Sequence, residues 1–159
     1  MPYDVTDFAT LMNLESHGPD VYVGVWPSYP WGGLYGGQIV AQALRAAYET
    51  VEPDRHVHSL HAYFIRGGDS NEPIRFEVDR IRNGRSFVTR RVVARQSSGP
   101  ILNLSASFQV REDAVDVQER MMTEDLPSPA DLKANDWGPI LQRRPMQPET
   151  RPARAKSWL

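Results

Sequence analysis

GGQIVAQALRAA, residues Gly36 to Ala47, is the stretch that decides how this chain of 159 residues folds. Apolar residues recur in it with the spacing of one helix face, and its alanines are small enough to let a helix approach a sheet closely. The pattern predicts a buried helix from Gly37 to Thr50, lying along the concave side of a sheet. Its apolar face consists of Ile39, Val40, Ala43, Leu44, Ala46 and Ala47, and Gln42, Arg45 and Glu49 fall elsewhere.

Runs rich in β-branched and aromatic residues flank this helix on both sides. One run precedes the helix and four follow it, with no second helical pattern between the four. The predicted strands are Val21–Trp26, His56–Arg66, Ile74–Arg82, Ser86–Gln96 and Ile101–Val110.

Turn signals separate the strands that follow the helix. They are Gly67-Gly68-Asp69, Asn83-Gly84 and Ser98-Gly99-Pro100. Asn83-Gly84 is the strongest, because both central positions of a tight hairpin turn favour positive φ. The last three strands are therefore predicted to form an antiparallel meander. One strand, one helix and four strands within the 90 residues from Val21 to Val110 predict an α+β hot-dog fold, a curled antiparallel sheet of about five strands wrapped around one central helix.

Composition excludes several classes of function. The net charge is −2 and acidic and basic residues are interspersed, so the chain has no field that would gather nucleic acid. Cysteine is absent, which excludes disulfides and thiolate metal sites. The acidic start lacks the features of a secretory signal, and no apolar run reaches the roughly 20 residues that span a bilayer. We therefore expect no membrane span and a cytoplasmic location.

Four phrases of the sequence together resemble the amino-terminal half of the acyl-CoA thioesterase II family. They are GGQIVAQALRAA, VHSLHAYFIRGGD (residues 57–69), DRIRNGRSFVTRRVVARQ (79–96) and SASFQV (105–110). The resemblance implies hydrolysis of fatty acyl-CoA to free fatty acid and CoA, with no metal or other cofactor. Members of the family carry two hot-dog domains in tandem, and their catalytic Asp, Ser or Thr, and Gln lie in the second domain. The resemblance therefore assigns no catalytic residue to this chain.

The resemblance and the proline distribution also predict the domain organisation. We expect a hot-dog domain over residues 1–112 and a proline-rich linker over 113–159, with a short helical turn around Ala130 to Ala134. The final residues, RPARAKSWL, look like the approach to a further strand. They lead toward a second hot-dog domain that this chain does not contain.

Gly36, Gly37 and Gln38 are the candidate residues for a substrate pocket. A helix amino terminus offers unpaired N–H groups and a partial positive charge to a developing oxyanion. Glycine admits a close ligand there, and the Gln38 amide offers both a donor and an acceptor. The alternative is that the glycines only let the loop turn tightly beneath the sheet.

His58 is a further pocket candidate. Strand alternation predicts His56 and His58 on one face and His61 on the other, so these three cannot form a metal site. His58 is then either a group on the substrate side or a hydrogen-bonded structural histidine beside the helix.

Arg85 and Arg90 are the candidate ligands of the CoA phosphates. They belong to a basic cluster around Asn83, and guanidinium groups suit phosphates. The alternative is a hairpin whose charges are solvated or paired in salt bridges.

Two functions remain open at this stage. The first is an acyl-CoA thioesterase of which this chain supplies one half, including one wall of the acyl channel. The second is a non-catalytic hot-dog module that binds acyl chains or serves in assembly. An unpaired sheet edge favours association, so we expect a homo-oligomer, or pairing with a second hot-dog domain.

Overall fold

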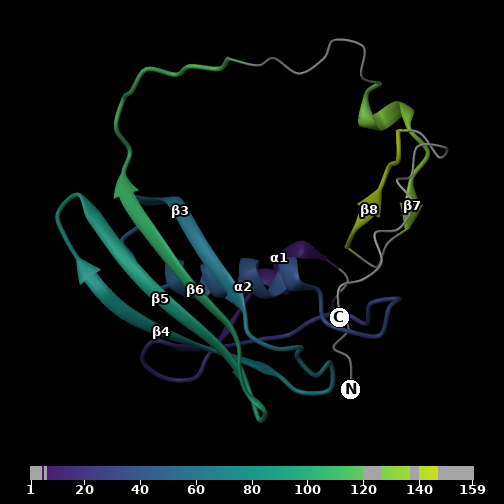
Figure 1. Ribbon diagram of the computed structural model, residues 1–159, viewed down its shortest axis with the longest axis horizontal. Coiled ribbons are helices and arrows are strands. Elements are labelled where there is room, and N and C mark those ends of the chain that lie inside the picture. The colour runs from purple at the N-terminus through teal and green to yellow at the C-terminus, as the bar shows by residue number, and fades with distance from the viewer. Residues whose placement is uncertain (1–4, 6, 120–126, 137–139, 147–159) are drawn as a thin grey trace.

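The computed structural model describes residues 5, 7–119, 127–136 and 140–146 (Figure 1). A single sheet and one long helix dominate it. In chain order the elements are α1 (Phe8–Met12), β1 (Glu15–Ser16), β2 (Val21–Gly24), α2 (Gly36–Tyr48), β3 (Arg55–Phe64), β4 (Ile74–Asn83), β5 (Phe87–Gln96), β6 (Gly99–Val110), a 3₁₀ turn (Pro129–Asp131), β7 (Asn135–Asp136) and β8 (Gln142–Arg143).

The main sheet has six antiparallel strands in the order β1-β2-β4-β5-β6-β3. The predicted meander is confirmed as β4-β5-β6, and the five expected strands are all present. The short strand β1 is the additional sixth. Strand β3 follows α2 in the chain but pairs with β6, so the helix connection carries the chain from one side of the sheet to the other.

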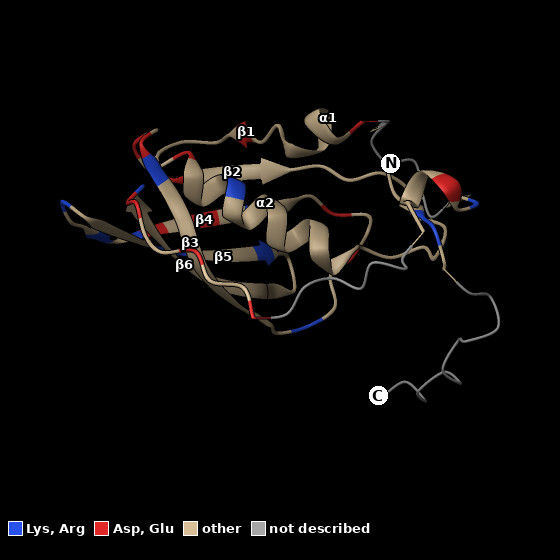
Figure 2. Cartoon of the chain, turned by 90° about the horizontal axis from the view of Figure 1, so that it is seen from above, with Lys and Arg blue, Asp and Glu red and all other residues tan. Residues whose placement is uncertain are grey.

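Helix α2 lies against the concave face of this sheet, as the sequence predicts (Figures 1 and 2). Ala43, Ala46 and Ala47 are completely buried, so the helix backbone comes close to the strands. Within α2 the single charged residue is Arg45. The strands contribute inward side chains that alternate along β4, β5 and β6, namely Ile74, Phe76, Val78, Val88, Val92, Ala94, Leu102, Leu104, Ala106 and Phe108.

The turn between β4 and β5 differs from the prediction. It consists of the three residues 84–86, and neither Asn83 nor Gly84 has a positive φ. A bulge in β4, where the register shifts between Asp79 and Arg82, precedes this turn, and Asn83 pairs with Val88. The predicted two-residue turn at Asn83-Gly84 is therefore wrong, although its position in the chain is right.

The turn between β5 and β6 is also displaced by a few residues. Gln96 pairs with Gly99, so Ser97 and Ser98 form the turn and β6 begins earlier than predicted. Gly99 has a φ of 106°, a conformation that glycine adopts without strain.

Strand β3 carries a second bulge. Val57 pairs with Phe108 and Ser59 pairs with Ser107, so that His58 is the extra residue. A bulge changes which face the following residues point to. The alternation predicted along His56–Arg66 therefore fails after His58.

Little regular structure follows β6 in the described part of the chain. The predicted helical turn is present as the 3₁₀ turn Pro129–Asp131, and β7 pairs with β8 in a separate small sheet. The expectation for RPARAKSWL lies outside the described residues. Among the helices that the structure describes, none is long and apolar enough to cross a membrane.

Substituting Gly24 tests the packing between β2 and α2. A Cβ atom at this position would lie 2.8 Å from Oε1 of Gln42, whose side chain is fully buried. Because hydrogen bonds to Leu11 and Val25 hold that side chain, it cannot move away freely. We expect Gly24→Ala to lower the free energy of unfolding by about 1–3 kcal/mol.

Urea denaturation followed by circular dichroism measures this change. Gly67→Ala is the matched control, because a Cβ at Gly67 would have no neighbour within 4 Å. Equal stabilities of the two variants would contradict the packing described for Gly24.

Candidate functional site

The start of helix α2 presents backbone donors. The N-cap residue Tyr35 makes no side-chain capping hydrogen bond, and the first turn contains no acidic residue. The N–H groups of Gln38 and Ile39 bond to the Tyr35 carbonyl. Those of Gly36 and Gly37 have no hydrogen-bond acceptor within the described residues. Two donors and the positive end of the helix dipole are therefore available to an oxyanion.

Close approach of aromatic rings explains both glycines at this helix start. A Cβ at Gly36 would lie 3.1 Å from the ring of Phe64 in β3, and one at Gly37 would lie 2.8 Å from the ring of Tyr35. Neither glycine has a positive φ. The alternative reading of a tight glycine turn is therefore wrong in its mechanism, because packing rather than backbone conformation requires the missing side chains.

Gln38 is buried within the protein, where its amide is fully engaged. Its Oε1 accepts a 2.7 Å hydrogen bond from the Tyr29 hydroxyl, and its Nε2 donates to the Val25 carbonyl and to Oε1 of Gln42. These bonds attach the loop before α2 to the helix.

Gln42 continues this network into the core. It is fully buried, and its Nε2 donates to the carbonyls of Leu11 and Val25 at 2.9 and 2.8 Å. The prediction that Gln42 lies away from the buried face is wrong. Its position four residues after Gln38 was the available signal, since residues four apart share one helix face.

An aromatic cluster covers the network on the loop side. Tyr29 stacks on Trp31 with ring centroids 4.6 Å apart, and Tyr35 meets both rings edge-on. Burial, with a smaller contribution from Tyr35, raises the pKa of Tyr29 to about 12. Tyr29 is therefore a stable hydrogen-bond donor at neutral pH.

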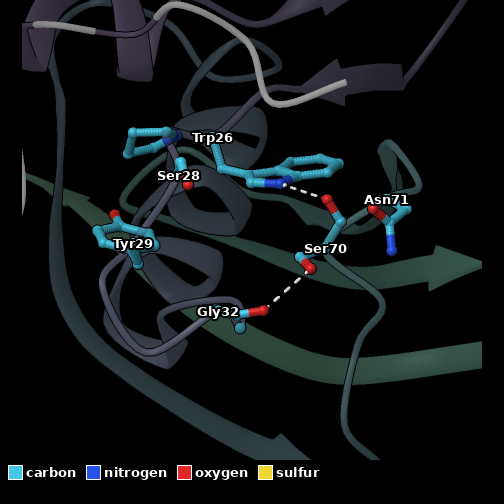
Figure 3. A pocket seen from close by; sticks show the side chains of 8 residues that line it. Trp26, Ser28, Tyr29, Gly32, Ser70 and Asn71 are labelled. Atoms are coloured by element: carbon cyan, nitrogen blue, oxygen red, sulfur yellow. Dashed lines mark hydrogen bonds between the residues drawn. The ribbon is translucent and has the colours of Figure 1, made fainter.

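A small pocket of about 130 Å³ lies beside this loop (Figure 3). Trp26 closes one wall by donating from Nε1 to the Ser70 carbonyl, and the Ser70 hydroxyl donates to the Gly32 carbonyl. Drug-sized ligands occupy roughly 300–1,000 Å³. The pocket therefore accommodates a small group but not a fatty acyl chain.

All three histidines of β3 lie on the convex face. His56 pairs with Gln109 and His61 pairs with Ser105, and these partners are four residues apart on β6. The bulge at His58 thus brings His61 to the same face as His56. The prediction of His61 on the opposite face is wrong for this reason.

His58 does not meet the start of α2. Its Nε2 lies 2.8 Å from the Ser107 hydroxyl on the convex face, and its ring contacts Phe87 edge-on. The sheet separates His58 from the helix, so the structure does not bring it together with Gly36, Gly37 and Gln38. Among the described residues, no group of three or more His, Asp or Glu side chains is arranged to hold a metal ion.

The two candidate phosphate ligands occupy different environments. Arg85 is exposed in the β4–β5 turn. Arg90 is 2% exposed and donates to the carbonyls of Thr50, Arg82 and Thr89 and to the Thr50 hydroxyl. Arg90 therefore binds the carboxyl-terminal end of the α2 segment, and the structure does not place it beside Arg85.

Carboxylates on the convex face are paired with arginines, as the sequence analysis allowed. Asp79 accepts from Arg91, and Glu77 accepts from Arg75 and Arg95. Such exposed ion pairs contribute about 0–1 kcal/mol each. None of these carboxylates is available as a base at the start of α2.

Comparisons with known proteins identify this architecture. The family profile "Acyl-CoA thioesterase N-terminal domain" matches residues 26–109, which is more than half of the chain. The chain belongs to the acyl-CoA thioesterase II family. Human acyl-coenzyme A thioesterase 8 is 42% identical over 123 residues, which cover 77% of this chain and 38% of the human protein. The chain thus spans well under half the length of this relative.

Solved structures agree with the thioesterase assignment. The acyl-CoA thioesterase II TesB2 of Mycobacterium marinum is 38% identical with a TM-score of 0.65, over 78% of this chain and 46% of that protein. A hot-dog protein of unknown function from Alicyclobacillus acidocaldarius has a TM-score of 0.69 at 23% identity, over 81% of this chain and 49% of that one. The likeness to the Alicyclobacillus protein supports the fold alone. The predicted hot-dog fold is thereby confirmed.

Substituting Tyr29 tests the buried network. We expect Tyr29→Phe to lower the free energy of unfolding at pH 7 by about 1–2 kcal/mol, because it leaves Oε1 of Gln38 without its donor. Unfolded tyrosine titrates near pH 10, whereas folded Tyr29 titrates at about 12. Between pH 10 and about 12 the unfolded chain loses the Tyr29 hydroxyl proton while the folded protein keeps it. The unfolded state is therefore favoured more as pH rises, and the wild type loses stability.

The stability difference between wild type and Tyr29→Phe should therefore be constant below pH 10 and shrink between about pH 10 and 12. Urea denaturation at a series of pH values measures it. A difference that stayed constant up to pH 11 would show that the pKa of Tyr29 is not raised.

Proposed function

We propose that this chain is one half of an acyl-CoA thioesterase, which hydrolyses fatty acyl-CoA to free fatty acid and CoA when a second hot-dog domain is paired with it. Membership of the thioesterase family, across the helix and the whole meander, carries this proposal. The substrate is acyl-CoA, no metal or other cofactor takes part, and we expect the reaction in the cytoplasm.

The chemistry divides between the two halves. In the hydrolysis, water attacks the thioester carbonyl, the C–S bond breaks, and the leaving thiolate takes up a proton. Donors must stabilise the oxyanion that forms at the carbonyl. The free N–H groups of Gly36 and Gly37 are this chain's candidates for that role. The water-activating residues come from the second domain, since no acidic residue stands in the first turn of α2.

Gln38 acts indirectly in this proposal, and His58 has no role in it. The Gln38 amide is a positioning group, because it ties Tyr29 and Val25 to the helix start. His58 lies on the convex face and belongs to the sheet surface rather than to the acyl channel.

An exposed apolar surface on β3 is the expected docking site for the second domain. No strand of the described part of the chain pairs with the outer edge of β3. Leu60 and Phe64 pair with the inward residues Ala106 and Leu102, yet both are largely exposed. Phe64 also touches the start of α2 at Gly36. A partner on this edge would cover the apolar surface and complete the acyl channel beside the free N–H groups.

A non-catalytic module that binds acyl chains or serves in assembly is the alternative function. The absence of an acidic residue from the first turn of α2 favours it. In that case the same β3 surface would bind its partner, but the complex would not turn over acyl-CoA.

Activity separates the two functions. We expect this chain alone to release no CoA from fatty acyl-CoA above background, and a fusion to the second hot-dog domain of a thioesterase II relative to release it continuously. A thiol reagent that detects free CoA gives the rate. A correctly folded fusion without turnover would favour the non-catalytic module.

The oligomeric state tests the β3 surface. We expect the isolated chain to form a homodimer through β3, with twice its mass of 18.0 kDa by light scattering. Phe64→Asp should give a monomer, because the interface would bury a charge without a partner. Ile81→Asp is the matched control, since Ile81 and Phe64 are both 59% exposed and Ile81 lies away from β3 near the β4–β5 turn. A monodisperse wild-type monomer, or a Phe64→Asp variant that still dimerises, would exclude this interface.

A further inference from the structure

A second hollow, of about 270 Å³, lies at the opposite end of α2 from the free N–H groups. It opens between the residues that follow the helix and the β4–β5 turn. At a rise of about 1.5 Å per residue, the helix places it roughly 20 Å from Gly36. Its polar lining includes Thr50, Glu52, Arg55, Arg80, Asn83 and Arg90.

Arg55 is the unexplained group in this hollow. Its side chain is only 14% exposed, and its Nε is buried without a hydrogen bond in the part of the chain that the structure describes. Its Nη1 donates to the Ser86 carbonyl at 3.3 Å. Oδ1 of Asp54 forms an ion pair with Nε at 3.4 Å but does not accept a hydrogen bond from it, and the Asp54 side chain is 65% exposed. A buried donor without an acceptor is costly and points to a missing ligand or water.

Arg90 adds a buried positive charge at the base of the same hollow. All of its hydrogen-bond acceptors are neutral oxygens, and within the described residues it has no carboxylate partner. Burial, followed by repulsion from Arg80, lowers the pKa of Arg90. A bound anion would relieve both effects, because it would supply the missing opposite charge.

Asp54 is paired with Arg55, but its carboxylate is exposed, so water and salt screen this ion pair. No other carboxylate in the part of the chain that the structure describes forms an ion pair with Arg55 or Arg90. Arg80 is already held by both carboxylate oxygens of Asp20. Glu52 lines the hollow but is exposed, so water and salt screen its charge. The buried charges of the hollow are therefore the two arginines, Arg55 and Arg90.

We propose that this hollow binds a phosphate-type oxyanion, with Arg55 as its main ligand and Arg90 as the buried charge beneath it. A phosphate offers several acceptor oxygens in different directions, which suits guanidinium donors that line a cavity. The bulge in β4 between Asp79 and Arg82 shapes the hollow, since it opens the strand pairing next to Arg90. The site is separate from the start of α2, and the proposal does not depend on thioester hydrolysis.

Isothermal titration of the whole chain with inorganic phosphate, at constant ionic strength, tests the site. We expect saturable binding with one phosphate per chain. Arg55→Gln should weaken this binding by about tenfold or more, which corresponds to about 1.4 kcal/mol. Arg55→Lys should weaken it less, because it keeps the charge but loses the planar pair of donors.

Arg91→Gln is the matched control. Arg91 is adjacent to Arg90 in β5 but faces Asp79 on the convex side of the sheet. The Arg91→Gln substitution removes the same formal charge as Arg55→Gln. The affinity of this variant for phosphate should stay within about twofold of the wild type if contact with Arg55, rather than net charge, binds the anion. Circular dichroism checks that each variant is folded.

Adenosine 3′,5′-bisphosphate distinguishes the source of the phosphate. If this bisphosphate binds about tenfold tighter than inorganic phosphate, and if Arg55→Gln abolishes that binding, the site belongs to a phosphorylated nucleotide such as that of CoA. Equal affinities would assign it to free phosphate. The proposal is overturned if neither probe shows saturable binding at about 10 mM, or if Arg55→Gln binds as tightly as the wild type.

Discussion

The packing of α2 against the concave face of the sheet is the contact on which the rest of this structure depends. Alanines at the centre of the interface let the helix backbone approach the strands, and each larger side chain buried around them contributes about 1.5–3 kcal/mol. Polar contacts also hold the segments on either side of the helix. Buried Gln38 and Gln42 donate to backbone carbonyls of the chain that precedes it, and buried Arg90 binds Thr50 just after its end, so the helix is fixed in both position and direction.

The two ends of α2 consequently have different properties. At the start, Gln38 and Gln42 hold the preceding loop, while the N–H groups of Gly36 and Gly37 have no acceptor among the residues that the structure describes. Near the end, Arg90 binds the carbonyl and hydroxyl of Thr50. The start is therefore suited to a developing negative charge on a substrate, and the end presents buried positive charge to a hollow beside it. One helix thus positions both sites that we propose.

The two edges of the sheet differ in how much unpaired backbone and apolar surface they expose. At one edge the two-residue strand β1 leaves little backbone unpaired. At the other edge β3 is ten residues long, and its apolar side chains at Leu60 and Phe64 stay exposed beside the start of α2. A long unpaired strand with exposed apolar residues is a template for association. The surface proposed to bind a partner and the N–H groups proposed to bind the oxyanion therefore lie next to each other.

Sequence alone determined the long helix and five of the six strands of the main sheet, with their order and the concave position of the helix, because these follow from hydrophobic periodicity and turn residues that act over a few positions. Tertiary structure decided the positions of the candidate site residues. The bulge at His58 moved His61 to the other face, β4 gained a bulge between Asp79 and Arg82, and the core enclosed Gln42 and Arg90. Bulges and buried polar contacts depend on partners that are distant in the chain, such as Leu11 for Gln42 and Thr50 for Arg90. Local patterns do not contain that information, and so a polar residue inside a helix or strand can be assigned to the surface when it is part of the core.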